Sequence, residues 1–319
     1  MLRPTLAAVA LALAPHAVPA LGPDAPPAPV HFSLVSAGPG VYAAIAKDGD
    51  RESLGNAGFV VGDEAVLVVD AFGTETGAQE LLQEVRRAAG GKPVRWVVNT
   101  HYHYDHTGGD AVFSRAGAAV VAHENVRAWV RTENLKFRKE VTPEFRRMVE
   151  ALVLPDVTHR DRLTIWLGGN RRVEVLAKPG HTGGDSIVWV PDAGVLFAGD
   201  LLWKTTAPNL IDASTDAWVE TLGGFVADYP AATYVPGHGP LAKALDVRYF
   251  RDYLFGLRSG VSRAIGEGKS GAALVEALLP AQKEKFGKWS WFDAFGARNL
   301  ELTEQELRGT KKLPQPPKS

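Results

Sequence analysis

The chain has 319 residues, with 35 Lys and Arg against 36 Asp and Glu, so its formal net charge is −1. Hydrophobic residues make up 45% of it, which excludes a long disordered chain, and the sequence pI near 6.8 argues against nucleic-acid binding through a basic field. The chain has 0 cysteines, so any metal site must use His, Asp or Glu, and neither a disulfide nor a cysteine nucleophile is available.

The N-terminus has the order of a secretory signal peptide: a charge at Arg3, an apolar run over 6–14, and small residues that end at Ala20. We expect residues 1–20 to be a signal peptide, cleaved after Ala20, of an exported protein that is periplasmic or secreted; a buried N-terminal helix is the alternative. The apolar run is shorter than the ~20 residues that span a bilayer, and no later segment reaches that length, so no integral membrane segment is expected after cleavage. Residues 21–40 are expected to form a flexible leader.

Apolar runs and helical periodicity define the elements of the first half. Residues 65–69 are continuously apolar and rich in β-branched side chains, as a strand buried on both faces requires, and the run ends at Asp70. Predicted strands cover 41–46, 58–61, 65–69, 94–98 and 118–122, and predicted helices cover 75–89 and 123–135.

The second half repeats this alternation. Predicted strands cover 163–167, 173–176, 186–190, 195–198 and 233–235, and predicted helices cover 216–226, 246–267 and 270–279. Because strands and helices alternate in both halves, helices should cover the faces of two sheets in a mixed α/β (α+β) fold. We expect one catalytic domain over 41–242, with a helical extension over 243–319 packed on the same domain.

The strongest chemical signal follows the predicted strand 94–98. Three imidazoles and a carboxylate, those of His101, His103, Asp105 and His106, fall within six residues. In an extended stretch His101, His103 and Asp105 would face one way. His106 can turn to a neighbouring position if a helix starts there. A solvent-exposed polar turn is the alternative. Imidazole and carboxylate together suit zinc, iron or manganese.

Three further residues complete a candidate ligand set. His181 lies in the stretch PGHTGGD, His238 lies in PGHGP, and Asp200 follows the apolar run 195–198, although an aspartate there can also be a turn residue. Five His and two Asp exceed the three protein ligands of a single catalytic zinc. The count fits two ions about 3.5–4 Å apart.

The HxHxDH, GHT, GD and GHG motifs, in this order, resemble the metallo-β-lactamase fold superfamily over 41–241. The resemblance implies a four-layer αβ/βα sandwich with the site at one edge. It implies that Asp200 bridges two metal ions and that Asp70 orients a ligand imidazole by accepting its distal N–H. The implied ligands of the first metal are His101, His103 and His181, and those of the second are Asp105, His106 and His238.

The resemblance also implies a hydrolase. Two divalent ions, zinc by preference with iron or manganese as alternatives, would hold a bridging hydroxide that attacks an ester, lactone, thioester or amide, a β-lactam included. Asp105 would be the catalytic residue that orients this nucleophile and shuttles a proton. An iron-dependent oxidoreductase similar to sulfur dioxygenases is the alternative. A phosphodiesterase is less favoured because the chain has no basic patch.

The substrate is expected to be a small molecule, with no nucleic acid as a partner, and the sequence sets no oligomeric state. Asp200 stands where one β-lactamase subclass has a cysteine, and this version resembles hydroxyacylglutathione hydrolases and lactonases. Lys204 and Asn209 are candidate substrate contacts, with a surface lysine and a turn asparagine as the alternatives. The aromatic stretch 288–292 either covers the mouth of the site or docks the C-terminal segment on the core.

Overall fold

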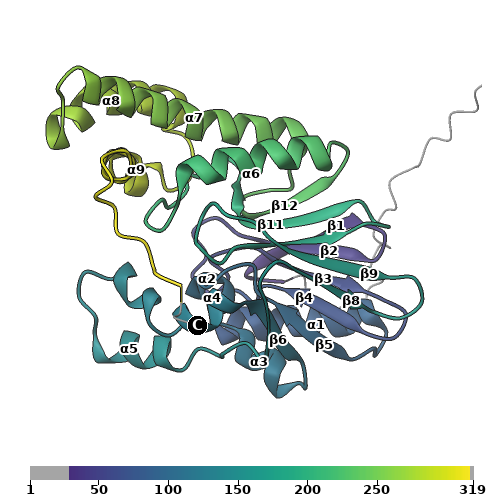
Figure 1. The fold of residues 1–319 in the computed structure, drawn as a ribbon. Coiled ribbons are helices and arrows are strands. Elements are labelled where there is room, and N and C mark those ends of the chain that lie inside the picture. Colours follow the sequence, from purple (N-terminus) through teal and green to yellow (C-terminus); the bar gives the residue numbers. More distant parts are fainter. Residues whose placement is uncertain (1–28, 317–319) are drawn as a thin grey trace, which may run out of the picture.

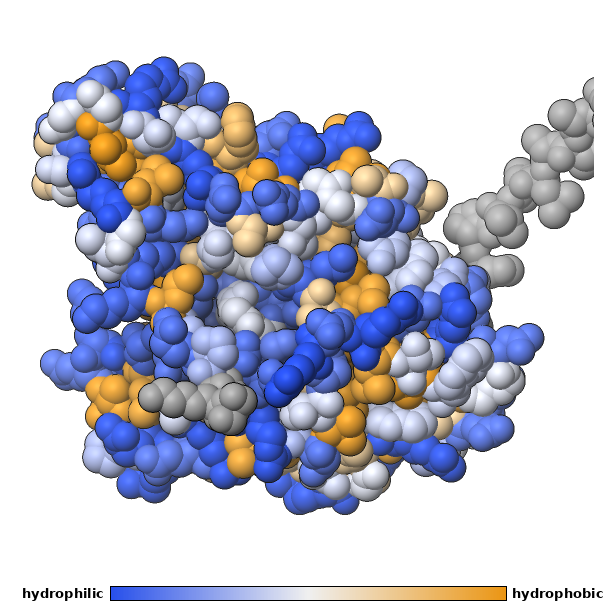
Figure 2. Space-filling view, in the orientation of Figure 1, coloured by the Kyte–Doolittle hydropathy of each residue, from blue (hydrophilic) through white to orange (hydrophobic). Residues whose placement is uncertain are grey.

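The computed structural model of the chain describes residues 29–316, in which two β-sheets face one another and helices cover the outer face of each (Figure 1). The predicted signal peptide lies outside the described residues. In the described part no helix combines the length and the apolar character needed to cross a membrane. The face seen in Figure 2 is mainly hydrophilic, with hydrophobic residues in small separate groups.

The first sheet is built from the N-terminal half of the chain and has its strands in sequence order. Its first four strands pair antiparallel, and the pairs from β4 to β7 are parallel. The strands are β1 (Phe32–Gly38), β2 (Val41–Ala46), β3 (Ala57–Val61), β4 (Val66–Val69), β5 (Val94–Val98), β6 (Ala119–His123) and β7 (Val157–His159). The helices between the parallel strands include α1 (Glu75–Ala89), α2 (Tyr104–Thr107), α3 (Asp110–Arg115), α4 (Glu124–Trp129) and α5 (Pro143–Glu150).

The second sheet has the order β12-β11-β10-β9-β8. Its strands pair antiparallel except for β11 and β12, which are parallel and are joined through the helix α6 (Thr215–Asp228). The strands are β8 (Arg162–Trp166), β9 (Arg172–Ala177), β10 (Ser186–Val190), β11 (Val195–Trp203) and β12 (Thr233–His238).

Alternation along a single strand shows how the layers form. In β4, Val66 and Val68 pack in the cluster that includes Leu81 of α1, whereas Leu67 and Val69 point the other way, into the layer between the two sheets. Successive side chains of a strand face opposite sides, so a strand covered on both sides needs an unbroken apolar run. The second sheet has its own outer layer of helices, which gives the four-layer αβ/βα sandwich that the family resemblance implied.

The C-terminal part is helical and lies over α6. It consists of α7 (Ala244–Gly266), α8 (Gly271–Phe286) and α9 (Phe292–Leu307). These helices share one buried apolar cluster with the outer face of the second sheet. The tail then returns toward the first half of the chain, where the indole Nε1 of Trp129 donates to the carbonyl of Gln315 at 2.9 Å (Figure 1).

Several local expectations differ from the structure. The strand expected over 195–198 continues to Trp203 as β11, and the helix expected over 270–279 continues to Phe286 as α8. Residues 32–38 form β1 inside the segment expected to be a leader, and the strand was missed because only its first residue is fully buried. The helix expected over 123–135 is divided into α4 and a 3-10 helix, η1 (Glu133–Phe137). The hydrophobic pattern of the sequence also did not predict β7 or α5, which are short and expose most of their residues.

Candidate metal centre

The loop and short helix after β5 provide four of the predicted ligands. His101 and His103 lie in the loop, and α2 begins at Tyr104, so Asp105 and His106 are already helical. This corrects the expectation that His101, His103 and Asp105 face one way in an extended stretch. The helical turn directs Asp105 and His106 together to a second group of ligand atoms.

The second sheet provides the other three. His181 lies in the loop between β9 and β10, Asp200 lies within β11, and His238 is the last residue of β12. The loop of His181 is held by Asp185, which accepts hydrogen bonds from the backbone N–H of Thr182 at 2.7 Å and from its hydroxyl at 2.5 Å. All seven predicted ligand side chains therefore meet where the two sheets adjoin.

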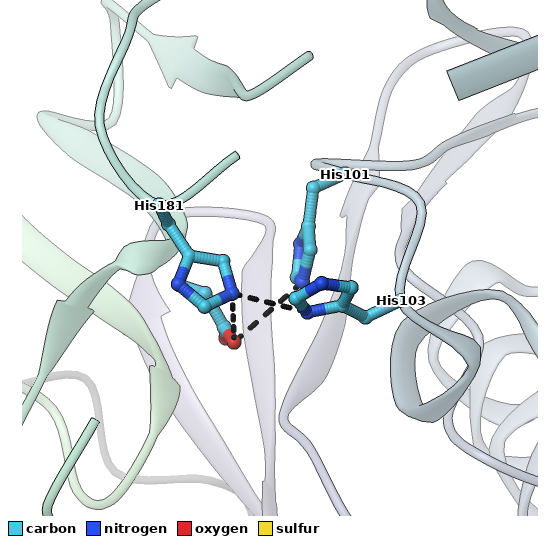
Figure 3. Close-up of side chains that lie close together, drawn as sticks. His101, His103 and His181 are labelled. Atoms are coloured by element: carbon cyan, nitrogen blue, oxygen red, sulfur yellow. Dashed lines mark hydrogen bonds and ion pairs between the residues drawn. The ribbon is translucent and has the colours of Figure 1, made fainter. Parts of the chain in front are cut away.

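His101, His103, His181 and Asp200 form the first group (Figure 3). The Nε2 atom of His181 lies 3.0 Å from Nδ1 of His103 and 3.2 Å from Oδ2 of Asp200. The Nε2 atom of His101 lies 3.5 Å from the same carboxylate oxygen. The ligand atoms of this group lie within 4.8 Å of one another, and all four side chains are buried.

Asp105, His106 and His238 form the second group. The Nε2 atoms of His106 and His238 are 3.4 Å apart and lie 3.6 Å and 3.4 Å from Oδ2 of Asp105. The same two atoms lie 3.1 Å and 3.3 Å from Oδ1 of Asp200. Asp200 therefore presents Oδ2 to the first group and Oδ1 to the second, which is the arrangement of a bridging carboxylate.

A hydrogen-bond chain behind the site fixes the orientation of two imidazoles. Asp70 accepts the backbone N–H and the hydroxyl of Thr100, both at 2.8 Å, and its Oδ2 lies 3.0 Å from Nδ1 of His106. Because the Thr100 hydroxyl donates to Asp70, its oxygen can accept the Nδ1–H of His101 at 3.0 Å. In both histidines Nδ1 then carries the proton, and Nε2 keeps a lone pair for the centre.

His103 is oriented by a residue that the sequence did not reveal. Its Nε2 lies 3.4 Å from Oδ2 of Asp212, so its Nδ1 faces the centre. Asp212 is buried, accepts the hydroxyl of Tyr102 and pairs with the ammonium of Lys136 at 2.5 Å. The only sequence signal was an aspartate in the loop after β11, a type common in turns.

Two glycines let neighbouring segments pack closely around Asp200. Gly199 has a φ of +51°, and a Cβ there would lie 2.4 Å from the hydroxyl oxygen of Thr100. A Cβ on Gly237 would lie 1.9 Å from Oδ1 of Asp200. Both contacts are closer than heavy atoms tolerate, so the GD and GHG motifs need glycine for steric reasons.

Charges in the centre shift the titration of its members. Burial alone would raise the pKa of the Asp105 carboxyl, but His106 and His238 outweigh it and lower that pKa to about 2. Burial likewise opposes charge on His106, yet Asp200, Asp105 and Asp70 raise the pKa of its imidazole well above the ordinary value. The buried carboxylates thus favour positive charge at this position.

The donor set fits divalent metal ions. The Nε2 atom of His101 and Oδ1 of Asp200 are buried without a hydrogen-bond partner among the described residues. Such atoms are costly to bury unless something binds them. Three nitrogens with one oxygen in the first group, and two nitrogens with one oxygen in the second, are ligands suited to zinc, iron or manganese.

A cleft with two cavities opens at the centre. One cavity of about 350 Å³ is lined by His103, Asp105 and Asp200, and also by Asn209. The other, of about 430 Å³, is lined by His238 and by polar residues of the loop 47–51. Residues of both ligand groups thus face space that a small molecule can enter.

The two candidate substrate contacts have different positions. Asn209 lies in the wall of the first cavity, and its Oδ1 accepts the N–H of Ile211 at 3.0 Å. Lys204 lines neither of these cavities. Its ammonium donates to the carbonyl of Leu241 at 2.9 Å and pairs with Asp246 at 3.0 Å. The geometry therefore gives no support to the expected contact between Lys204 and substrate.

The aromatic stretch 288–292 serves both purposes weighed for it. Trp289 packs against Tyr253 and Phe286, with ring centroids 5.2 Å and 4.8 Å away, and so docks the helical extension. Trp291 lines both cavities, with its ring centroid 4.8 Å from that of His238. The helical extension therefore contributes directly to the wall of the site.

Comparison with known proteins places this geometry in a family. A family model described as the metallo-beta-lactamase superfamily matches residues 50–238. The metallo-beta-lactamase type 2 of Bacteroides fragilis is 27% identical over 188 residues, which cover 58% of this chain and 68% of that enzyme.

Other relatives carry different names. The hydroxyacylglutathione hydrolase of Rhodospirillum rubrum is 29% identical over 147 residues, or 46% of this chain and 48% of that enzyme, so the match spans about half of that relative. A solved metallo-beta-lactamase from Pontibacter korlensis aligns with a TM-score of 0.58 at 24% identity, covering 70% of this chain and 99% of that one. This structural likeness shows the fold.

Proposed function

The chain belongs to the metallo-beta-lactamase superfamily, and on that premise we propose that it is an exported, zinc-dependent hydrolase that cleaves an ester, lactone, thioester or amide bond. A metal-dependent hydrolase is the general function that its relatives support. Export is proposed from the sequence pattern of residues 1–20, and zinc from the nitrogen-rich donor set.

The observation that carries the proposal is the position of Asp200. Its two oxygens face two different ligand groups, which argues for a pair of ions. His101, His103 and His181 would hold one ion, Asp105, His106 and His238 the other, and Asp200 both. Divalent ions held in this way polarise a substrate carbonyl and lower the pKa of water enough to supply hydroxide near neutral pH.

Asp105 is the residue of this chain best placed to handle the proton. Its carboxylate lines the first cavity, and its low pKa keeps it charged and able to accept a hydrogen bond from the attacking water. When water adds to the acyl carbon, the bond to the leaving group breaks, and the proton removed from the water passes through Asp105 to the leaving group.

Other residues keep the geometry fixed during this step. Asp70 and Thr100 hold His106 and His101, while Asp212 holds His103. The indole of Trp203 stacks on His238, with ring centroids 4.0 Å apart and an interplanar angle of 25°. Such support is required because small displacements of reacting groups reduce the rate strongly.

The test is proton release in a pH-stat with zinc-loaded protein against a cephalosporin, an acyl lactone, a glutathione thioester and a phosphodiester. We expect release from one of the first three substrates, and a rate at least about 100-fold lower in Asp105→Ala with zinc still bound. Asp63→Ala, at an exposed position of a turn, is the matched control. If none of the four substrates releases protons, and the iron-loaded protein consumes oxygen, the hydrolase proposal fails and the protein is an oxidoreductase.

A further inference from the structure

The 350 Å³ cavity beside the centre has a largely apolar wall. One side is formed by His103, Asp105 and Asp200, which belong to the two ligand groups. Much of the remaining surface consists of carbon-rich side chains, those of Leu54, Phe137, Trp203, Trp291, Ala294 and Phe295. A group placed against this wall would exchange water for apolar surface.

The aromatic residues of this wall are held in place by contacts with the centre. The ring of Phe137 meets His103 edge-on, with centroids 4.7 Å apart and an interplanar angle of 83°. The ring of Trp291 lies 5.7 Å from that of Trp203 and 4.8 Å from that of His238. The apolar wall thus begins at the ligand imidazoles themselves.

The backbone at Trp291 is held in an unfavourable conformation. Its φ is +64°, a left-handed value that is uncommon for a bulky residue. The neighbouring Ser290 is fixed by two backbone hydrogen bonds, one from Ala207 to its carbonyl at 2.8 Å and one from its N–H to Thr205 at 3.0 Å. A strained residue persists where its surroundings determine it, and such strain is concentrated at functional sites.

The basic side chains near this cavity are engaged with other partners. Lys136 pairs with Asp212 and Glu133, and Lys204 binds the start of α7. Arg138 lies over the ring of Phe145, with its guanidinium carbon 5.4 Å from the ring centroid. Within residues 29–316, no lysine or arginine lines the cavity, so its wall offers no side-chain cation to a substrate carboxylate.

From this wall, and resting on the proposed function, we propose that the cavity receives an uncharged apolar group next to the scissile carbonyl, such as a phenylalkyl or short alkyl chain. Trp291 and Phe295 determine this preference. Both belong to the helical extension, beyond the segment 50–238 that the family model matches. The substrate preference therefore depends on a part of the chain outside the family match.

The first test compares esters that share one leaving group and differ in the acyl chain. For the zinc-loaded protein, kcat/KM should rise about fourfold for each methylene until the cavity is filled. A chain that ends in a carboxylate should be at least tenfold poorer than its methyl-ended counterpart. Phe295→Ala should abolish most of the gain from chain length, so that kcat/KM for the longer esters falls toward that for the acetyl ester.

Two further variants make the comparison selective. Phe255→Ala removes an aromatic ring that is 61% exposed on α7, outside the cavity, and should leave the chain-length series unchanged. Ala294→Arg places a cation in the cavity wall. Ala294 is an exposed residue of α9, so the variant protein should fold. Its substrate preference should shift toward the carboxylate-ended ester. The proposal would be overturned if the wild type preferred the carboxylate-ended ester and Arg138→Ala lost that preference, because Arg138 would then bind the carboxylate.

A binding measurement on the metal-free protein separates this inference from the proposed function. Calorimetric titration with 4-phenylbutanol should show binding that Phe295→Ala weakens at least fivefold and Phe255→Ala does not. If that binding is present and no ester is cleaved after zinc loading, the hydrolase proposal fails while the apolar cavity stands. If esters are cleaved at rates independent of chain length and 4-phenylbutanol does not bind, the apolar cavity is refuted and the hydrolase stands.

Discussion

The Nε2 atom of His103 lies 3.4 Å from Oδ2 of Asp212, although the two residues are 109 positions apart in the chain. This contact determines which nitrogen of the imidazole faces the centre, because Nε2 donates to the carboxylate and Nδ1 remains for a ligand. Asp212 in turn is tied to Tyr102 and Lys136, so the orientation of one candidate ligand depends on a buried polar network.

We expect Asp212→Ala to lower affinity for the metal of the first ligand group about 10- to 100-fold, because His103 loses the partner that fixes its ring. Competition with a chromophoric chelator measures this affinity. Asp212→Asn is the matched variant, since it keeps an oxygen acceptor of the same shape and should lose less. Equal affinity in the wild type and Asp212→Ala would show that the contact does not support the centre.

Asp70→Ala should act mainly on the second ligand group, through His106, and more weakly on the first, through Thr100 and His101. Asp70 is buried and accepts from Thr100 and His106, so its removal frees the ring of His106 and leaves the Thr100 hydroxyl without its acceptor. Activity should fall about 10- to 100-fold, with earlier loss of the second metal during dialysis. Asp63→Ala should retain both metals. If Asp70→Ala retained both metals as fully as the wild type, Asp70 would not be needed to orient His106.

The helical extension is tied to the catalytic half by Glu306. Its carboxylate accepts the N–H of Thr215 at 2.9 Å, pairs with Arg258 at 3.0 Å and lies 3.6 Å from the ammonium of Lys311. Glu306→Ala leaves two largely buried cations without this partner and should reduce the free energy of unfolding by about 1–3 kcal/mol. Glu301→Ala, which breaks a half-exposed ion pair on the same helix, should cost under about 1 kcal/mol.

Urea unfolding of both variants measures these free energies. A loss for Glu301→Ala equal to that for Glu306→Ala would show that burial of the Glu306 network adds nothing to the attachment of the extension.

The loop that carries Leu54 should loosen in acid. Burial opposes charge on Asp50, but hydrogen bonds from the Ser53 backbone and the His31 ring prevail and lower the pKa of its carboxyl to about 2. Because the pKa of Asp50 is lower in the folded state, its charged carboxylate stabilises the fold at pH values above the ordinary pKa of 3.8. This stabilisation is lost as the pH falls toward 2. Asp50→Asn should therefore be less stable than the wild type at pH 5, by an amount that shrinks near pH 2.

Denaturant midpoints of the two proteins at both pH values test this expectation. A difference that is constant with pH, or larger in acid, would contradict the assignment of the stabilisation to the charged form of Asp50.

The parts of the fold that the sequence predicted are those with continuous apolar runs. β4 and the first four residues of β11 are fully buried apolar runs, and such runs are readable without knowledge of their partners. The rest of β11, which contains Asp200, was not predicted as strand. By contrast, β1 is an edge strand with mostly half-buried residues, and its pairing with β2 depends on long-range contacts. Strands of this kind resemble loops in composition.

A similar distinction separates the residues of the site. The HxHxDH stretch concentrates its side chains in six positions, so a local pattern was sufficient to single them out. Asp212 comes from a loop that no motif singled out, and only the folded chain brings it to His103. Trp291 lies in the stretch 288–292, for which the sequence left two roles open, and the fold places it against His238. Their roles depend on tertiary contacts that no local spacing contains.

If Asp200 joins two metal positions, its removal should change the number of metal ions that the protein binds. Zinc bound per chain should be measured by elemental mass spectrometry after equilibrium dialysis of the wild type and Asp200→Ala, with folding checked by circular dichroism. We expect two zinc ions per chain in the wild type and at most one in Asp200→Ala. Two ions retained by Asp200→Ala, or only one in the zinc-saturated wild type, would contradict this expectation.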